Sequence, residues 1–197
     1  MAAIRITAGN LRGRRVPVPP TDVRPTSERA RQAYFNIIGD RITGARFLAL
    51  FSGSGIFSFE AVSRGAASST AIDRDKRNTT TIAKLAATFD AAVNVVTGDV
   101  LTLLPRMKEP FDLVYADPPY DFEDYSELIE GIAALPLAPD AIVAVEHRRG
   151  SNPFENREPR TANRELTITR HAEYGEVWIT FFATAEAAAT GLAIREE

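Results

Sequence analysis

The chain has 197 residues, and its 45% apolar content is enough for one full domain with a modest appendage. No apolar run approaches the ~20 residues needed to cross a bilayer, and no signal segment follows the N-terminal arginines, so we expect a cytoplasmic protein with no membrane partner. Because the chain has no cysteine and only two histidines, disulfides, zinc-thiolate sites and cysteine nucleophiles are excluded, and we expect no metal.

The net charge of -3 conceals a strong asymmetry along the chain. Residues 1–31 contain seven arginines against one aspartate and one glutamate, a net charge of +5, which leaves -8 for the remainder. A basic segment on an acidic body indicates that one end binds a polyanion. The alternative is a solvated charged face without a ligand.

The first 42 residues are predicted to form a separate arm. Short β-compatible runs at 4–7 and 14–18 lie around Gly9 and Gly13 and predict a hairpin. Four prolines then forbid a continuous helix, and a helical apolar spacing runs from Ser27, a suitable N-cap, to Ile38 before Gly39.

From residue 43 to 197 the pattern alternates between strands and helices, which predicts a single α/β domain. Strands are expected at 46–50, 69–72, 93–97, 113–116 and 141–146, with helices at 56–64, 76–89, 101–107 and 125–135 between them. Strands at 166–171 and 177–182 close the domain, so the sheet is predicted to be mainly parallel with a late antiparallel hairpin. We expect a surface loop at 150–164 and a helical or frayed alanine-rich tail from Ala183.

A glycine-rich loop follows the first of these strands. It reads Phe51-Ser52-Gly53-Ser54-Gly55, and its glycines allow a ligand to approach the backbone at a helix N-terminus. The dinucleotide fingerprint would continue with glycine or alanine where this chain has Ser58, so a nicotinamide or flavin cofactor is disfavoured. A plain tight turn is the alternative.

Two acidic residues follow the next two strands. Asp73 lies twenty residues after Gly53, a spacing typical of a carboxylate that accepts both hydroxyls of a ribose. Asp99 could accept a hydrogen bond from an adenine amino group. Alternatively, Asp73 is a surface acid or the N-cap of the helix at 76–89, and Asp99 caps the helix that follows it.

The most specific motif follows the strand at 113–116 and reads Asp117-Pro118-Pro119-Tyr120. A string of this type arises by chance in on the order of one in a few hundred chains of this length. The Asp117 carboxylate and the Pro118 carbonyl can each accept an N–H of a base amino group, which turns the nitrogen lone pair towards a methyl donor. Tyr120 offers a flat face for base stacking. We predict that these four residues form the catalytic loop of a methyltransferase that acts on a base amine.

At this point the chain resembles a known family, the bacterial small-subunit rRNA guanine-N2 methyltransferases, over roughly residues 4–182. Besides the two loops, the resemblance is carried by Ile4-Arg5-Ile6, Ala8-Gly9, Arg12-Gly13-Arg14-Arg15, Arg24-Pro25-Thr26, Arg29, Arg31, Phe35-Asn36, Glu60-Ala61 and Ser63-Arg64-Gly65-Ala66. The arginine-rich opening is more particular to this family than the central loops are.

The resemblance implies a Rossmann-like class I methyltransferase fold with a mainly parallel seven-stranded sheet, a C-terminal antiparallel hairpin and a small N-terminal hairpin and helix. It implies S-adenosylmethionine over residues 51–55, with its ribose at Asp73 beside Arg74 and its adenine at Asp99 and Val100. The arm would bind phosphates of 16S rRNA, within a partly assembled 30S subunit, and we expect a monomer. The RNA-binding residues would be Arg5, Arg12, Arg14, Arg15, Arg24, Thr26, Arg29 and Arg31.

The sequence departs from the family at Ala49, where members usually carry an acid that helps to hold the methionine end of the cofactor. Loss of a charged acceptor costs about 1.5 to 3 kcal/mol of affinity when nothing replaces it. A non-catalytic RNA-binding or assembly factor on a methyltransferase scaffold is therefore one alternative. An adenine-N6 methyltransferase acting on DNA or RNA is the other, because the same loop suits that amine. A small-molecule methyltransferase would not need the basic arm.

Overall fold

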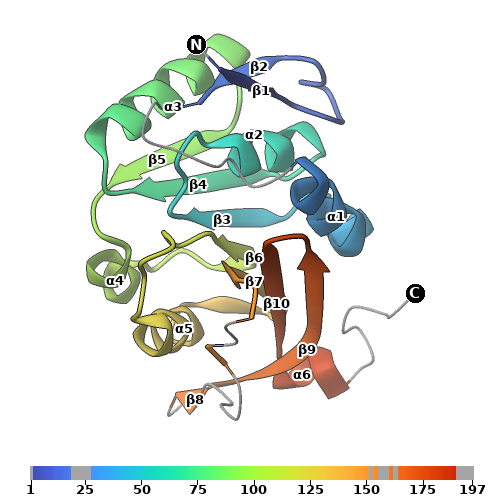
Figure 1. Ribbon diagram of the computed structural model, residues 1–197, viewed down its shortest axis with the longest axis vertical. Coiled ribbons are helices and arrows are strands. Elements are labelled where there is room, and N and C mark those ends of the chain that lie inside the picture. Colours follow the sequence, from blue (N-terminus) through green and yellow to red (C-terminus); the bar gives the residue numbers. More distant parts are fainter. Residues whose placement is uncertain (1, 19–27, 151–152, 155–159, 162–163, 190–197) are drawn as a thin grey trace. The chain divides into compact units, whose positions relative to one another are not determined.

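The computed structural model describes residues 2–18, 28–150, 153–154, 160–161 and 164–189. The chain forms two compact units, Met1–Asp99 and Val100–Glu197, whose elements are labelled in Figure 1. The predicted boundary after residue 42 falls inside the first unit, which contains the arm. Among the described residues, none of the helices has the length and apolar character needed to cross a membrane.

The first unit combines the predicted hairpin with three parallel strands and their helices. In chain order it contains β1 (Ala3–Arg5), β2 (Arg15–Pro17), α1 (Glu28–Ile38), the 3-10 helix η1 (Gly39–Ile42), β3 (Arg46–Leu50), α2 (Ile56–Ser63), β4 (Ser68–Asp73), α3 (Lys76–Phe89) and β5 (Val93–Thr97). β1 pairs with β2 antiparallel, and β4 pairs in parallel with both β3 and β5. The predicted hairpin, helix and strands are thus confirmed with small shifts at their ends.

Burial explains why these segments adopt their structures. β3 is apolar from Phe47 to Leu50, and these residues are all buried, as is typical of a parallel strand covered on both faces. α3 is amphipathic instead, and it buries Thr79, Ile82 and Ala86 at helical spacing. Asp75 is its N-cap and accepts a hydrogen bond from the Arg77 backbone N–H at 2.8 Å.

The second unit carries the remaining strands. It contains α4 (Val100–Leu103), η2 (Leu104–Arg106), β6 (Phe111–Ala116), α5 (Tyr125–Ala133), β7 (Leu137–Arg148), β8 (Arg160–Thr161), β9 (Arg164–Tyr174), β10 (Val177–Thr184) and α6 (Ala185–Ala189). β6 and β7 are parallel, whereas β10 is antiparallel to both β7 and β9. The two units together contribute the seven predicted strands, and β8 adds a two-residue strand paired with β9.

The segment predicted as a surface loop at 150–164 is partly incorporated into the second unit. Phe154 is buried, and its ring packs edge-to-face against Tyr125 and Phe182. The alanine-rich tail forms α6, as predicted for a helical tail, and residues 190–197 lie outside the described part of the chain.

Candidate functional site

The glycine loop is a strained turn that leads directly into α2. Phe51, Gly53 and Gly55 have positive φ angles of 57°, 50° and 79°, a region that L side chains rarely adopt. A Cβ at Gly55 would lie 2.8 Å from Cγ1 of Ile82, so packing against α3 also requires glycine there. The turn places backbone N–H groups at the start of α2, as the loop motif predicts.

Asp73 is tied to this loop. The Gly53 N–H donates to Asp73 Oδ2 at 2.7 Å and the Asp75 N–H donates to Oδ1 at 2.8 Å. Asp73 is buried, and Asp75 rather than Asp73 caps α3, so neither alternative for Asp73 holds. The Asn78 side-chain amide also donates to Oδ1 at 3.4 Å. Because a carboxylate has about four acceptor positions, these three contacts orient Asp73 and leave it able to accept a ribose hydroxyl. The chemistry of this group therefore fits a nucleoside-containing cofactor.

The other predicted cofactor residues lie at the ends of β4 and β5. Arg74 and Asp99 are exposed, and Val100 is buried at the start of α4. Their contacts with adenine and ribose remain predictions. Ala49 is buried in β3 beside Ala71 of β4, and its carbonyl accepts a 2.9 Å hydrogen bond from the Ser52 hydroxyl.

The predicted catalytic loop follows β6 in the second unit. Asp117 is half-buried and Pro118 is buried, whereas Pro119 is exposed. The Pro119 carbonyl accepts the Phe122 N–H at 2.9 Å, which closes a turn with Tyr120 inside it. Tyr120 is 56% exposed, a rare state among the large aromatic side chains that the structure describes, so its ring is accessible to a base.

Two further ionisable groups lie close to Asp117, and the sequence analysis did not identify them. Glu146, near the end of β7, is buried and accepts a 2.5 Å hydrogen bond from the Tyr115 hydroxyl. Burial, together with the negative charges of Asp117 and Glu146, raises the pKa of Tyr125 to about 12. Glu146 follows the apolar run of β7 just as Asp117 follows β6, and that pattern could have revealed it.

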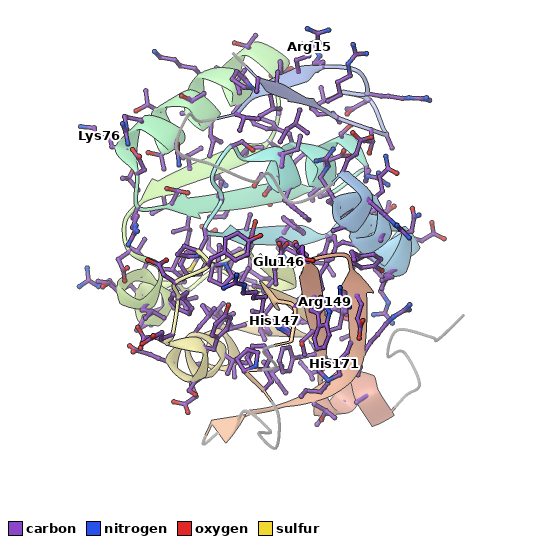
Figure 2. The ribbon with its side chains drawn as sticks, in the orientation of Figure 1. Arg15, Lys76, Glu146, His147, Arg149 and His171 are labelled. Carbon is purple, nitrogen blue, oxygen red and sulfur yellow. The ribbon has the colours of Figure 1, made fainter. Side chains whose placement is uncertain are left out.

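The arm presents most of its arginines to solvent. Exposed arginines on the described part of the arm are Arg5, Arg12, Arg14, Arg15 and Arg29. Figure 2 shows the side chain of Arg15 at the outer side of the hairpin. The guanidinium of Arg14 lies 4.9 Å from the ring centroid of Phe89. Arg24 and Thr26 lie outside the described residues.

The prediction for Arg31 needs correction, because its side chain is 1% exposed and is not accessible to phosphate. Its Nε donates to Glu60 Oε1 at 3.2 Å, and its Nη2 donates to the Arg5 carbonyl at 3.0 Å. Arg31 therefore joins the arm to α2 inside the first unit, and it is removed from the proposed RNA surface.

Glu60 is the centre of this buried network. Its Oε1 also accepts the Thr7 N–H and the Thr7 hydroxyl at 2.7 Å each, and its Oε2 accepts Arg64 Nε at 3.1 Å. The Arg64 guanidinium also stacks over the Phe35 ring of α1 at 4.7 Å. Glu60 is fully buried, so the two arginines compensate its charge, and the network connects β1, α1 and α2.

The hairpin also contacts the end of α2 through backbone groups. Ser63 accepts the Asn10 N–H at 2.9 Å on its carbonyl and the Leu11 N–H at 2.9 Å on its hydroxyl. A Cβ at Gly9 would lie 1.6 Å from the Ser63 carbonyl oxygen. Only glycine fits at position 9, because any side chain would overlap this carbonyl. The close contact positions the hairpin against the helix that begins at the glycine loop.

Known proteins resemble this chain over most of its length. The family model described as conserved hypothetical protein 95 matches residues 4–183. The ribosomal RNA small subunit methyltransferase D of Escherichia coli is 36% identical over 148 residues, which are 73% of this chain and 74% of that protein.

Two solved structures have folds similar to that of this chain. The E. coli protein yhhF, provisionally described as a methyltransferase, has a TM-score of 0.79 and 31% identity over 93% of this chain and 98% of its own. A Streptococcus mutans protein, provisionally described as a SAM-dependent methyltransferase, has a TM-score of 0.63 over 77% of this chain and 48% of its own, at 19% identity. The chain therefore belongs to the conserved hypothetical protein 95 family of methyltransferases, is related to ribosomal RNA small subunit methyltransferase D, and has the predicted Rossmann-like methyltransferase fold.

Proposed function

We propose that this protein transfers a methyl group from S-adenosylmethionine to the exocyclic N2 amine of a guanine in small-subunit rRNA. The observation that carries the proposal is the loop of residues 117–120, with a half-buried carboxylate and an exposed aromatic ring at the end of β6. The relationship to ribosomal RNA small subunit methyltransferase D favours rRNA as the substrate.

The residues of the loop have distinct roles in the proposed reaction. When bound, S-adenosylmethionine supplies the electrophilic methyl group. Asp117 and the Pro118 carbonyl accept the two N–H groups of the amine, orient its lone pair and stabilise the positive charge that develops on nitrogen. Tyr120 stacks on the base, a contact worth about 1 to 3 kcal/mol. The amine nitrogen would gain the methyl group as the methyl–sulfur bond of the donor breaks, and it would lose one proton to the Asp117 carboxylate or to water. A paired guanine would first be extruded.

The cofactor is assigned to the glycine loop and to the residues that follow β4 and β5. The loop of residues 51–55 and the Asp73 carboxylate would bind the cofactor, with its ribose at Asp73 beside Arg74 and its adenine at Asp99 and Val100. These groups only bind and orient, so the loss of one of them should raise the cofactor Kd more than it lowers the rate at saturation.

The direct test is methyl transfer from labelled cofactor to 30S particles and to naked 16S rRNA, followed by mapping and mass analysis of the modified nucleoside. We expect N2-methylguanine at one position, with better transfer to the partly assembled particle. N6-methyladenine would support the adenine alternative and overturn the guanine proposal. Sedimentation of the free protein would test the expected monomer.

The arm should supply salt-dependent RNA affinity. Replacing Arg12, Arg14 and Arg15 by glutamine should weaken binding to 16S rRNA and reduce the slope of log K against log salt by about 2, because each phosphate contact contributes about 0.7 to 0.9. Filter binding at several salt concentrations measures both quantities. A control that neutralises the exposed Arg106, Lys108 and Arg149 should leave the slope unchanged; an equal effect would contradict a specific role for the arm.

Ala49 allows a test of the non-catalytic alternative. Ala49→Asp should tighten S-adenosylmethionine binding about tenfold or more, because it adds a charged acceptor. The same change should lower the stability of the ligand-free protein, since the position is buried in β3. Calorimetry gives the affinity, and Ala49→Asn fills similar space without the charge. Wild-type protein that binds no cofactor at millimolar concentration would favour the scaffold alternative.

A further inference from the structure

Glu146 lies at the same level of the sheet as the catalytic Asp117. β6 and β7 are parallel, and Tyr115 pairs with Ala144 and Ala116 with Val145 in the register. The next residues along the two strands are Asp117 and Glu146, so both carboxylates lie at the carboxyl ends of adjacent strands. The effect of both charges on the pKa of Tyr125 agrees with this placement.

The Glu146 carboxylate is held in one orientation. Register partners in a parallel pair point to the same face of the sheet, and Tyr115 and Glu146 are therefore on one face. The Tyr115 hydroxyl, itself buried, donates to Glu146 Oε2 at 2.5 Å. Figure 2 labels Glu146 beside His147 near the end of β7. A buried carboxylate is costly unless it is paired and hydrogen-bonded.

Guanine has a hydrogen-bond donor next to its N2 amine that a second carboxylate at this place could accept. The guanine N2 amine is adjacent to N1–H, a donor, whereas the corresponding N1 of adenine is an acceptor. An amine held by Asp117 therefore presents N1–H to a neighbouring acceptor. A carboxylate accepts this hydrogen and repels the lone pair of an unprotonated N1, which provides discrimination that Asp117 alone cannot provide.

We infer that Glu146 is a specificity-determining residue that accepts the N1–H of the target guanine, and that Tyr115 is the positioning residue that orients it. This inference rests on the proposed function and deepens it by assigning the recognition of guanine rather than its methylation. A carboxylate has about four acceptor positions, and the Tyr115 hydroxyl uses one of them.

The test replaces the target guanine by 2-aminopurine, which keeps the N2 amine but has an unprotonated N1. Small subunits reconstituted with either base at the mapped position are methylated, and the ratio of the two kcat/KM values is measured. The wild type should prefer guanine by about tenfold or more. Glu146→Gln should reduce this preference by at least about tenfold, because the glutamine amide can donate to N1 of 2-aminopurine.

Two variants keep the test decisive. Glu173→Gln removes the same charge from an exposed position on β9 and should leave the ratio unchanged. Tyr115→Phe retains the carboxylate but removes the hydroxyl that orients it, and the preference should fall several-fold. This variant decides the question if Glu146→Gln does not fold.

The outcomes separate the two proposals. A wild type that methylates adenine overturns both, because adenine has no N1–H. A wild type that methylates guanine, with an unchanged preference in both Glu146→Gln and Tyr115→Phe, overturns only the assignment of Glu146 and Tyr115. Thermal unfolding and cofactor calorimetry should show folded variants with wild-type affinity for S-adenosylmethionine.

Discussion

Asp117→Ala should lower kcat for methyl transfer by at least about 10²- to 10³-fold, the usual cost of removing one group that stabilises transition-state charge. The carboxylate lies in a loop after β6 and is only half-buried, so its removal should not disturb the fold. Single-turnover transfer of labelled methyl groups to the rRNA substrate measures the loss.

Controls for this variant distinguish chemistry from folding. Asp121→Ala changes an exposed acid four residues further along and should retain wild-type activity. Asp117→Asn keeps one oxygen acceptor and should be impaired less than alanine. Cofactor affinity, measured by calorimetry, should be the same in all three variants, and retained activity in Asp117→Ala would refute the proposed mechanism.

Glu60→Ala should destabilise the protein by about 3 to 5 kcal/mol, since it leaves buried arginine charge without its partner. Arg31 and Glu60 are almost completely buried, and the Thr7 N–H loses its acceptor as well. Urea unfolding followed by circular dichroism measures the change, and the midpoint should fall while the slope stays constant.

An exposed acid serves as the control for Glu60. Glu109→Ala should change the free energy of unfolding by less than about 0.5 kcal/mol, as is usual on the surface. A change below about 1 kcal/mol in Glu60→Ala would show that the network is not structurally important. Arg31 would then need another explanation for its burial.

The sites at strand ends were predictable because each follows a simple local pattern. Glycine and acidic residues directly after an apolar run mark the carboxyl edge of a parallel sheet, where ligands bind. This pattern identified the glycine loop, Asp73 and Asp117 as candidates, and the structure adds a 2.7 Å hydrogen bond from the Gly53 N–H to Asp73. Glu146 satisfies the same pattern but was not selected, because no recognisable motif follows it.

The sequence predicted the net charge of the arm but not which of its arginines are exposed. Helical spacing places Arg31, unlike Arg29, on the face of α1 that carries Tyr34 and Ile38. Spacing alone does not show that an arginine on that face is buried. Burial depends on the acid that packs against the side chain, and Glu60 is 29 residues away from Arg31 in the chain. The arginines in the described part of the arm thus divide into an exposed set and a structural one only after folding.

By itself the sequence determined the order of strands and helices, the glycine loop and the candidate catalytic loop. These depend on the period of the hydrophobic residues, on the backbone conformations that glycine and proline allow, and on short motifs. Tertiary structure decided which charges are buried, that Gly9 must pack against Ser63, and that Glu146 lies level with Asp117. Those features arise from contacts between residues far apart in the chain, and long-range pairing leaves no periodic trace in a single sequence.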